Sequence, residues 1–391
     1  MKVRLGDICT VVSGSTPKST VPEYWDGDIK WITPAELSDD TYIINDSARH
    51  ITALGVAKTG LKSFPAGTVI LSSRAPIGKT AIAGCEMFCN QGFKNFICSE
   101  KIDSKYLYYF LSGKTDYLNS LGRGATFKEI SKAIVENIEI TLPEIEEQKR
   151  IAARFERLMR LIQLQKTELE ELDKLVKSRF IELFGDLVIG NKVDTNKKRI
   201  GEIASVTKLA GFEFTKYIQY KEHGDIIMLR GLNCKKGHLI LDDIKWIDKE
   251  TSDLLPRSKL YYGDILMTYA GTIGDVAMVD ANDKYHLAPN VAKITINDMN
   301  AYNPVFLMHL FMYTNDYIMT FASVVAQASI NMEKIRGFEY YFPPIEKQNQ
   351  FAAFVEQTDK SKYYSSLSLR YCQAAANTYR QEWMTCQTSD F

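Results

Sequence analysis

The segment closest to a known ligand-binding motif is SSRAPIGKT, residues 72–80. A phosphate-binding loop joins a strand to a helix through GxxxxGK[ST], whose backbone amides and lysine hold the phosphates. Gly78, Lys79 and Thr80 supply the end of this pattern, but Ser73 stands where its first glycine belongs. Because only AIA separates Thr80 from the next glycine, no helix can follow. Nucleotide hydrolysis at Gly78-Lys79-Thr80 is therefore an alternative that we do not favour.

No other group of residues has the spacing of a catalytic or metal site. The five histidines lack metal-ligand spacing, and neither a GxSxG nor a GxGxxG pattern occurs. The seven cysteines are odd in number and form no CxxC pair, which indicates reduced thiols and is typical of a cytoplasmic protein. We therefore expect a non-catalytic chain without a cofactor or a metal of its own.

Length and composition predict at least two domains, since 391 residues with 45% hydrophobic side chains exceed one typical core. Basic and acidic side chains number 48 each, so any contact with nucleic acid must come from local clustering of charge. The N-terminal segment has no long apolar core, and no uncharged apolar run approaches 18 residues. We expect neither secretion nor a membrane span.

An internal repeat decides the expected architecture. Residues 130–156 and 330–356 share nine identities in 27 positions at an offset of 200, whereas chance gives roughly one in twenty. The copies also begin alike, because RLGDI at 4–8 returns as RIGEI at 199–203. The chain therefore reads as a globular module followed by a long helix, then a second module and a second helix.

A coiled-coil seam marks both predicted helices, the first of which should run from about 145 to 184, after Pro143 and before Gly185. Seam residues recur at alternating steps of four and three. They are Ile151, Phe155, Leu158, Ile162, Leu169, Leu172, Val176 and Leu183, then Phe351, Val355, Leu369, Cys372, Ala376, Tyr379 and Trp383. Helices of about 40 residues would reach roughly 55 to 60 Å. We predict that they pack antiparallel on each other; the alternatives are that each folds onto its own module or that partner subunits cover part of a seam.

Each module should be a mixture of helices and strands. The strand-like runs are 68–73, 95–98, 225–229, 264–269 and 291–296, separated by Gly, Asn and Pro turns. The repeat aligns Gly78 with Gly274, while Lys79 meets an aspartate, Asp275. What recurs is a strand, a glycine turn and a second strand, so residues 72–80 are predicted to form a structural turn.

The predicted organisation is α+β with a pseudo-twofold repeat. It comprises module 1 (1–143), a central spacer helix (144–186), a linker (187–198), module 2 (199–343) and a C-terminal spacer helix (344–385). Two similar modules held apart by paired helices could each read one object at a fixed separation. Double-stranded DNA, whose surface repeats every 10 to 10.5 base pairs, is a suitable target for such a pseudo-dimer.

Several sequence blocks, in this order and repeated in the second copy, carry a family resemblance. They are RLGDICTVVSGSTP, the GTVILSSRAPIGKTAIAG and GDILMTYAGTIGDVAMV blocks, the LPEIEEQKRIA and FPPIEKQNQFA junctions, and LVKSRFIELFGD. Over essentially its whole length the chain resembles the specificity subunit of type I restriction-modification enzymes. The resemblance implies two target-recognition domains that each read half of a split DNA site. It also implies two S-adenosylmethionine-dependent methyltransferase subunits around the helices, ATP- and Mg-dependent restriction subunits, and no catalysis in this chain.

Candidate DNA contacts follow from the residue types that hold phosphates and read base edges. In module 1 they are Ser15, Thr16, Lys18, Arg74, Lys79, Gln91, Lys94 and Arg123, and in module 2 they are Lys216, Arg230, Asn233, Lys235, Lys236, Tyr269, Asn290 and Gln327. For any one of these residues, an exposed position without DNA contact is an equally good interpretation, because Lys and Arg are mostly exposed.

Module 2 departs from the first at TKLAGFEF, which replaces SGSTP and suggests a different half-site; the last helix ends in CQTSDF instead of a glycine-aspartate stop. The alternative of a different class is a scaffold that binds two proteins and no nucleic acid, which the zero net charge would suit.

Overall fold

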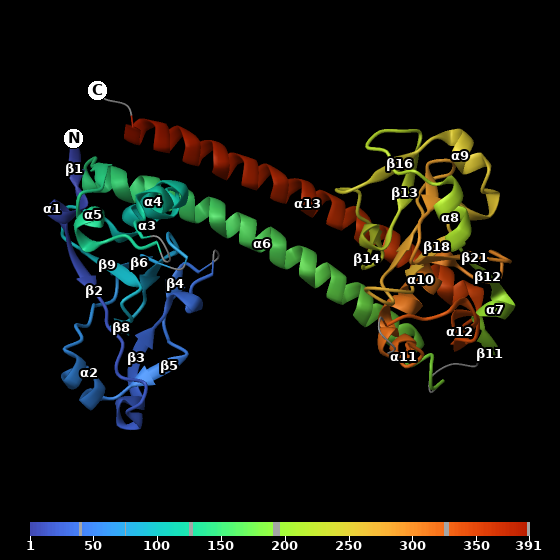
Figure 1. Cartoon of the computed structure of the whole chain (residues 1–391), viewed down its shortest axis with the longest axis horizontal. Helices are drawn as coiled ribbons and strands as arrows, with labels where there is room; N and C mark the ends of the chain where they lie inside the picture. The colour runs from blue at the N-terminus through green and yellow to red at the C-terminus, as the bar shows by residue number, and fades with distance from the viewer. Residues whose placement is uncertain (39–40, 75, 125–127, 191–195, 324–327, 389–391) are drawn as a thin grey trace. The chain divides into compact units, whose positions relative to one another are not determined.

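The computed structural model of the chain describes residues 1–38, 41–74, 76–124, 128–190, 196–323 and 328–388. These residues form two compact units: unit 1 comprises Met1–Lys166 with Leu367–Phe391, and unit 2 comprises Thr167–Ser366. Each unit is a mixed α/β module together with parts of two long helices, α6 (Ile145–Phe184) and α13 (Ile345–Thr388) (Figure 1). The predicted fold class is confirmed.

Unit 1 is built on a five-stranded sheet in the order β2-β9-β6-β7-β4, beside a three-stranded sheet in the order β5-β3-β8. The strands of the first sheet are β2 (Cys9–Ser13), β9 (Phe93–Cys98), β6 (Val69–Ser72), β7 (Thr80–Ala83) and β4 (Ile43–Ile44), and those of the second are β5 (Arg49–Ile51), β3 (Trp25–Ile32) and β8 (Phe88–Cys89). The strands β1 (Lys2–Arg4) and β10 (Glu139–Thr141) pair separately. The short helices are α1 (Leu5–Ile8), α2 (Ala53–Thr59), α3 (Ser104–Ser112), α4 (Thr115–Leu121) and α5 (Lys132–Glu136).

Unit 2 repeats this plan with a four-stranded sheet in the order β12-β21-β18-β19 and a second sheet in the order β16-β13-β20-β17. The strands are β12 (Ala204–Lys208), β21 (Val291–Ile296), β18 (Ile265–Thr268), β19 (Val276–Met278), β16 (Lys245–Ile247), β13 (Ile226–Leu229), β20 (Tyr285–Leu287) and β17 (Lys259–Leu260). Two further pairs are β11 (Asn196–Arg199) with β22 (Glu339–Phe342) and β14 (Cys234–Lys235) with β15 (His238–Leu239). The helices are α7 (Ile200–Ile203), α8 (Gly211–Tyr217), α9 (Lys249–Asp253), α10 (Pro304–Tyr313), α11 (Asn315–Met319) and α12 (Met332–Arg336). All five strands predicted from the sequence are present.

The repeat is visible in individual hydrogen bonds. Gln148 of α6 accepts a 2.9 Å hydrogen bond from the backbone N–H of Asp103, the N-cap of α3, and Gln348 of α13 accepts one of 2.9 Å from Asn303, the N-cap of α10. Both glutamines are buried, at 1% exposed. A buried amide must be paired, so these glutamines fix the start of α3 and of α10 against the long helices.

Every predicted seam residue is buried or half-buried. In unit 1 the Phe155 ring of α6 lies 4.7 Å from the Tyr379 ring and 5.2 Å from the Trp383 ring of α13. In unit 2 the Asp173 carboxylate of α6 pairs with the Lys362 ammonium at 2.7 Å.

The helix pairing within each unit is antiparallel. In unit 2 the ring of Phe180 lies 5.3 Å from that of Phe351. From the Asp173–Lys362 pair to this ring pair, the residue number rises along α6 and falls along α13. Since Phe155 is 1% exposed, replacing it by alanine would cost about 3 to 5 kcal/mol. The pairing predicted from the seam is confirmed inside both units.

The two long helices end differently against the modules. In unit 2, Gly185 adopts φ 64° after α6, and the Leu187 carbonyl then accepts a 2.9 Å hydrogen bond from the Tyr341 N–H. In unit 1, the Gln387 side chain of α13 accepts the equivalent bond from the Thr141 N–H at 2.9 Å and donates to the Tyr106 hydroxyl at 3.0 Å. A glutamine side chain thus replaces the glycine-aspartate stop.

Within the described residues, Cys9, Cys85, Cys89, Cys98, Cys234 and Cys372 carry thiols that form no disulfide. Across the described ranges, no helix is both long enough and apolar enough to cross a membrane.

Candidate nucleic-acid interface

Most of the predicted contacts in unit 1 meet at one edge of the five-stranded sheet. Neighbouring strands are antiparallel, so β2 and β6 end where β9 and β7 begin. We call this the unit 1 edge. It carries Ser15, Thr16, Arg74, Lys79, Gln91 and Lys94, together with Arg123 and Glu129, which β-bridges attach to it. Four segments far apart in sequence therefore present polar side chains together.

A carboxylate that the sequence analysis missed, Glu129, organises the basic side chains of this edge. The Lys94 ammonium lies 3.2 Å from one Glu129 oxygen, and the Arg74 guanidinium lies 4.0 Å from the other. The Arg123 and Glu129 backbones exchange two hydrogen bonds of 3.0 Å. Lys94 is only 7% exposed in its side chain, so it holds Glu129 in place while Arg74 and Arg123 keep exposed surface.

A close approach of two backbones positions the neighbouring polar pair. A Cβ on Gly14 would lie 2.0 Å from the Cys89 carbonyl oxygen, so only glycine fits here. This approach brings the exposed Thr16 hydroxyl within hydrogen-bonding distance of the Gln91 amide oxygen. Hydroxyl and amide groups of this kind bind phosphates and base edges.

The loop after Thr16 follows the small sheet. The Trp31 indole donates to the Ser15 carbonyl at 3.0 Å, and the Trp25 indole donates to the Lys18 carbonyl at 3.2 Å. The Arg49 guanidinium stacks over the Trp25 ring at 3.6 Å. Exposed cationic side chains of Lys18 and Arg49 therefore continue the surface beyond the unit 1 edge.

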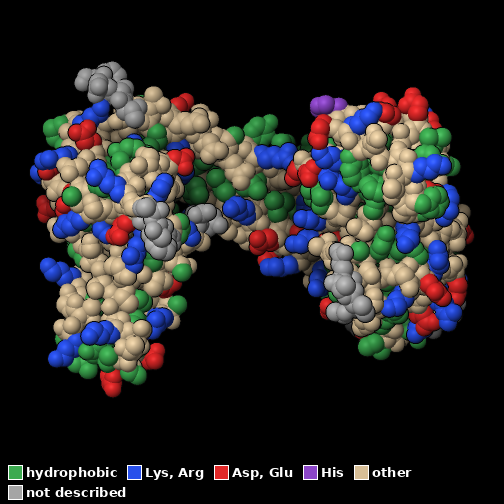
Figure 2. Space-filling model, viewed as in Figure 1, with side chains coloured by type: hydrophobic (Ala, Val, Ile, Leu, Met, Phe, Trp, Pro, Cys, Tyr) green, Lys and Arg blue, Asp and Glu red, His purple; other side chains and the backbone are tan. Residues whose placement is uncertain are grey.

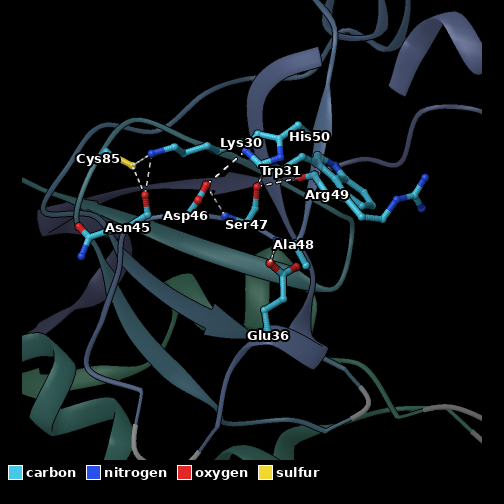
Figure 3. A network of polar contacts seen from close by, with 10 residues as sticks. All are labelled: Lys30, Trp31, Glu36, Asn45, Asp46, Ser47, Ala48, Arg49, His50 and Cys85. Carbon is cyan, nitrogen blue, oxygen red and sulfur yellow. Dashed lines mark hydrogen bonds and ion pairs between the residues drawn. The ribbon is translucent and has the colours of Figure 1, made fainter. Parts of the chain in front are cut away.

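Polar contacts beside Arg49 hold its loop in one conformation (Figure 3). The Lys30 ammonium bonds the Asn45 carbonyl at 2.7 Å, and the Ser47 hydroxyl donates to the Arg49 carbonyl at 2.7 Å. The Asp46 carboxylate accepts the Ser47 backbone N–H at 2.9 Å, which lowers the pKa of Asp46. The sequence alone does not reveal this loop, because its polar side chains have no periodicity and no motif spacing.

The described part of the predicted turn, residues 72–74 and 76–80, joins two antiparallel strands, β6 and β7; residue 75 lies outside the described residues. Gly78 has φ 99° and its counterpart Gly274 has φ 83°, in the left-handed region that favours glycine. The Lys79 ammonium donates to the Leu37 carbonyl at 2.6 Å, and a strand follows where a phosphate loop requires a helix. The geometry gives nucleotide binding no support.

Unit 2 has an equivalent edge formed by the end of β12, the start of β21 and the end of β18. We call this the unit 2 edge. It carries two predicted residues, Tyr269 and Asn290, whose backbones share a 3.0 Å hydrogen bond. Lys208, which the sequence analysis missed, places its ammonium 5.5 Å from the centre of the Tyr269 ring. In such a pair the cation can bind a phosphate while the aromatic ring stacks on a base.

The other predicted residues of unit 2 lie on segments other than these three strands. Asn233 is 0% exposed, and its amide donates to the Ile240 and Asp243 carbonyls, so it holds its own loop. The Arg230 guanidinium is paired with Asp243 at 2.8 Å. Lys235 and Lys236 are exposed in and after β14, and Lys216 is exposed on α8. Gln327 lies outside the described residues.

Charge on the face shown in Figure 2 is mixed, with acidic and basic side chains interspersed over both units. Within the described ranges, no group of three His, Cys, Asp or Glu side chains could hold a metal ion. Local polar edges, and no broad basic face in this view, are therefore the candidate interface.

Comparison with known families and proteins identifies relatives. The family described as "Type I restriction modification DNA specificity domain" matches residues 1–174 and 192–363. The type I restriction enzyme MjaIX specificity subunit of Methanocaldococcus jannaschii is 36% identical over 251 residues, which cover 60% of this chain and 58% of that subunit. The EcoBI specificity subunit of Escherichia coli is 24% identical over 66% of this chain and 59% of that protein. The chain thus spans less than two thirds of these relatives.

Solved structures share the fold. An S subunit of a type I restriction-modification system from M. genitalium has a TM-score of 0.58 at 14% identity, covering 97% of this chain and 94% of that one. A chain from a study of complex assembly and conformational transition of the type I R-M system has a TM-score of 0.61 at 17% identity, covering 98% of this chain and 96% of that one.

Proposed function

Because the chain belongs to the family of type I restriction modification DNA specificity domains, we propose that it recognises DNA sequence for a type I restriction-modification complex without catalysing a reaction itself. Each module reads one half of a split site. Residues 1–143 and 199–343 are the two reading modules, 144–186 and 344–385 are spacer helices, and 187–198 is the linker between them.

The observation that carries this proposal is the repeated sheet edge. Both units align the same strand ends, and Ile130 and Ile330 each donate a 2.9 Å backbone hydrogen bond to the segment after β6 and β18, to Ser73 and Tyr269 respectively. The side chains on this common backbone differ between the copies. A constant frame with variable polar side chains suits a reader whose two half-sites differ in sequence.

We assign DNA contact to residues that these edges expose and, in unit 1, to the two exposed cationic residues that continue the surface beyond the edge. In unit 1 they are Thr16, Lys18, Arg49, Arg74, Gln91 and Arg123, and in unit 2 they are Lys208, Tyr269 and Asn290. Arginine and lysine neutralise phosphates, while glutamine, asparagine and arginine read base edges. Lys94 and Glu129 position Arg74 and Arg123, and Asn233 positions the loop that follows Arg230.

Methylation and cleavage belong to partner subunits in this proposal. Two methyltransferase subunits that use S-adenosylmethionine dock around the helices, and restriction subunits that use ATP and Mg join them. The protein-scaffold alternative shares the helix docking but predicts no selective DNA binding.

A gel-shift series with the chain and its methyltransferase partner tests the proposal. We expect one split sequence to be retained from a random duplex library, and binding to weaken when the spacer between the half-sites gains or loses base pairs. Equal retention of all sequences would contradict recognition. Equal binding at every spacer length would contradict the spacer role of the helices alone.

A further inference from the structure

Unit 2 contains an open groove of about 1400 Å³ that the edge-based function does not use. It lies between α10, the turn that joins β14 to β15, and the parts of α6 and α13 in this unit. Val305, Met308 and Met312 of α10 and Val355 of α13 line its apolar side. This volume exceeds the roughly 300 to 1,000 Å³ of ordinary small-molecule pockets. The groove therefore fits a segment of polypeptide better than a metabolite.

At the equivalent place in unit 1 the chain supplies its own occupant. The Tyr42 ring, just before β4, lies 4.9 Å from the Tyr108 ring of α3, and its hydroxyl donates to the Glu156 carboxylate of α6 at 2.7 Å. The Lys105 ammonium of α3 also pairs with Glu156 at 2.7 Å. An aromatic side chain and two charge-assisted hydrogen bonds thus close the space between α3 and α6.

The repeat offset of 200 places Val305, Met308 and Glu356 at the positions of Lys105, Tyr108 and Glu156. The edge segment is also present, because Gly237 bridges to Ala277 of β19 in parallel, as β4 pairs with β7.

Unit 2 lacks the side chain that fills the space in unit 1. A Cβ on Gly237 would lie 3.2 Å from the Met308 methyl group, so the position faces the groove but carries no side chain. The Glu356 carboxylate pairs with Lys360 one turn along the same helix at 2.8 Å. Among the described residues, no hydrogen bond from another element reaches it.

The charge around the groove distinguishes protein from nucleic acid as the occupant. Lysines and acidic residues are nearly equal in number along its rim, whereas a surface for the DNA backbone is predominantly positive. Two adjacent tyrosines on the rim, Tyr363 and Tyr364, are 63% and 69% exposed. Methionine and tyrosine are enriched in the buried centres of protein interfaces.

We propose that this groove is a docking site for a segment of the methyltransferase subunit, which inserts a tyrosine or another aromatic side chain with a hydrogen-bond donor over Met308 to reach Glu356. The proposal rests on the proposed function for the identity of that partner. It makes docking asymmetric, since Tyr42 already occupies the equivalent place in unit 1.

Two substitutions test the docking in the complete chain with its methyltransferase partner. Glu356→Ala removes the acceptor, and Val305→Lys copies unit 1 by placing an ammonium where it pairs with Glu356. Glu356 has 72% of its side chain exposed, so its removal should leave the fold and the melting temperature unchanged. We expect each variant to weaken partner binding about tenfold, measured by titration of the labelled chain.

Glu346→Ala is the matched control, because Glu346 is exposed on the same helix but does not line the groove. Unchanged partner affinity in both groove variants, with wild-type melting, would overturn the proposal. Equal weakening by Glu346→Ala would also overturn it, since the effect would then reflect the charge of α13 and not the groove.

A photo-crosslinker in place of Tyr363 identifies the occupant. Crosslinking to the methyltransferase subunit supports the proposal, whereas crosslinking to a second copy of this chain, or none, contradicts it. Failure of the wild-type complex to select any DNA would refute the proposed function, yet tenfold weaker partner binding by Glu356→Ala would still support the groove. Selective DNA binding with unaffected groove variants would refute the groove alone.

Discussion

At the unit 1 edge, Lys94 of β9 lies opposite Ser13 of β2, whereas at the unit 2 edge Lys208 of β12 lies opposite Ala292 of β21. The lysine of unit 2 therefore stands on the strand next to the one that carries it in unit 1, while the strand pairing is the same in both units. In unit 1 the charge is held by Glu129, but the position 200 residues later is Ser329, and the ammonium of Lys208 lies over Tyr269 instead. The same frame therefore supports two different polar surfaces.

The backbone frame and the polar surface that it carries are therefore separable in this fold. Backbone hydrogen bonds, the glycine turns and the buried glutamines of the long helices recur in both units. The side chains at the strand ends and beside the long helices do not recur. Substitutions in the frame should therefore change stability, and substitutions at the edges should change recognition.

The largest effect on stability is expected from Gly14→Ala, which disturbs the backbone at the unit 1 edge. The new Cβ would meet the Cys89 and Asn90 carbonyl oxygens at 2.0 and 2.3 Å, so the backbone must move. We expect a loss of about 4 kcal/mol in the free energy of unfolding. Urea unfolding followed by tryptophan fluorescence measures it, because three of the four tryptophans lie in unit 1.

Gly211→Ala in unit 2 is the matched control, since its Cβ would have no neighbour within 4 Å. It should change the stability by less than about 0.5 kcal/mol. An equal loss in both variants would mean that the close approach at Gly14 is not what stabilises the edge.

We expect acid to destabilise α10 but not α3, because the two helices differ on the side that faces the long helices. His309 of α10 stands where α3 has Tyr109, and burial lowers its pKa to about 4, despite its 2.8 Å hydrogen bond with the Val305 carbonyl. The unfolded state, with the ordinary pKa of histidine near 6.5, binds a proton first as the pH falls. Stability is therefore lost between about pH 6.5 and 4, by about 3 kcal/mol.

Hydrogen exchange of residues 304–313 as a function of pH measures this loss. His309→Tyr, which copies unit 1, should remove the acid-dependent part of the opening free energy. Identical pH profiles for the wild type and this variant would assign the acid sensitivity to other groups.

The smallest effect is expected from Tyr42→Phe, which removes the hydroxyl that reaches Glu156. Although burial raises the pKa of Glu156, hydrogen bonds from Lys105 and Tyr42 lower it overall, so the carboxylate is charged at neutral pH. Losing one such hydrogen bond should cost about 1 kcal/mol at pH 7. Calorimetry should show no change for Glu356→Gln in unit 2, and an equal change in both would contradict the difference between the two copies.

Local patterns predicted much of the fold. Five strands, both long helices, their antiparallel pairing and the glycine turns at Gly78 and Gly274 follow from periodicity and from the repeat. The seam missed two buried rings, Phe180 and Phe184, because they also face α10, which sequence periodicity along α6 cannot show.

The site was less predictable, since its contacts join distant segments. Glu129 and Lys94 are 35 residues apart, and Tyr42 and Glu156 are 114 apart, so no spacing reveals either pair. Asn233 looked like a base reader because a polar loop residue has the same sequence signature whether it holds its own loop or a ligand. Lys208 lies in strand β12, where its residue type alone does not indicate a contact.

Selection of binding sites from a random duplex library, with the complete chain and its methyltransferase partner, tests the central claim most directly. The double variant Arg74→Ala with Arg123→Ala should relax one half of the selected site and leave the other half intact, with binding weakened about tenfold to a hundredfold. Lys208→Ala with Asn290→Ala should relax only the other half. If either variant changed both halves, or neither half, the two edges would not be independent readers.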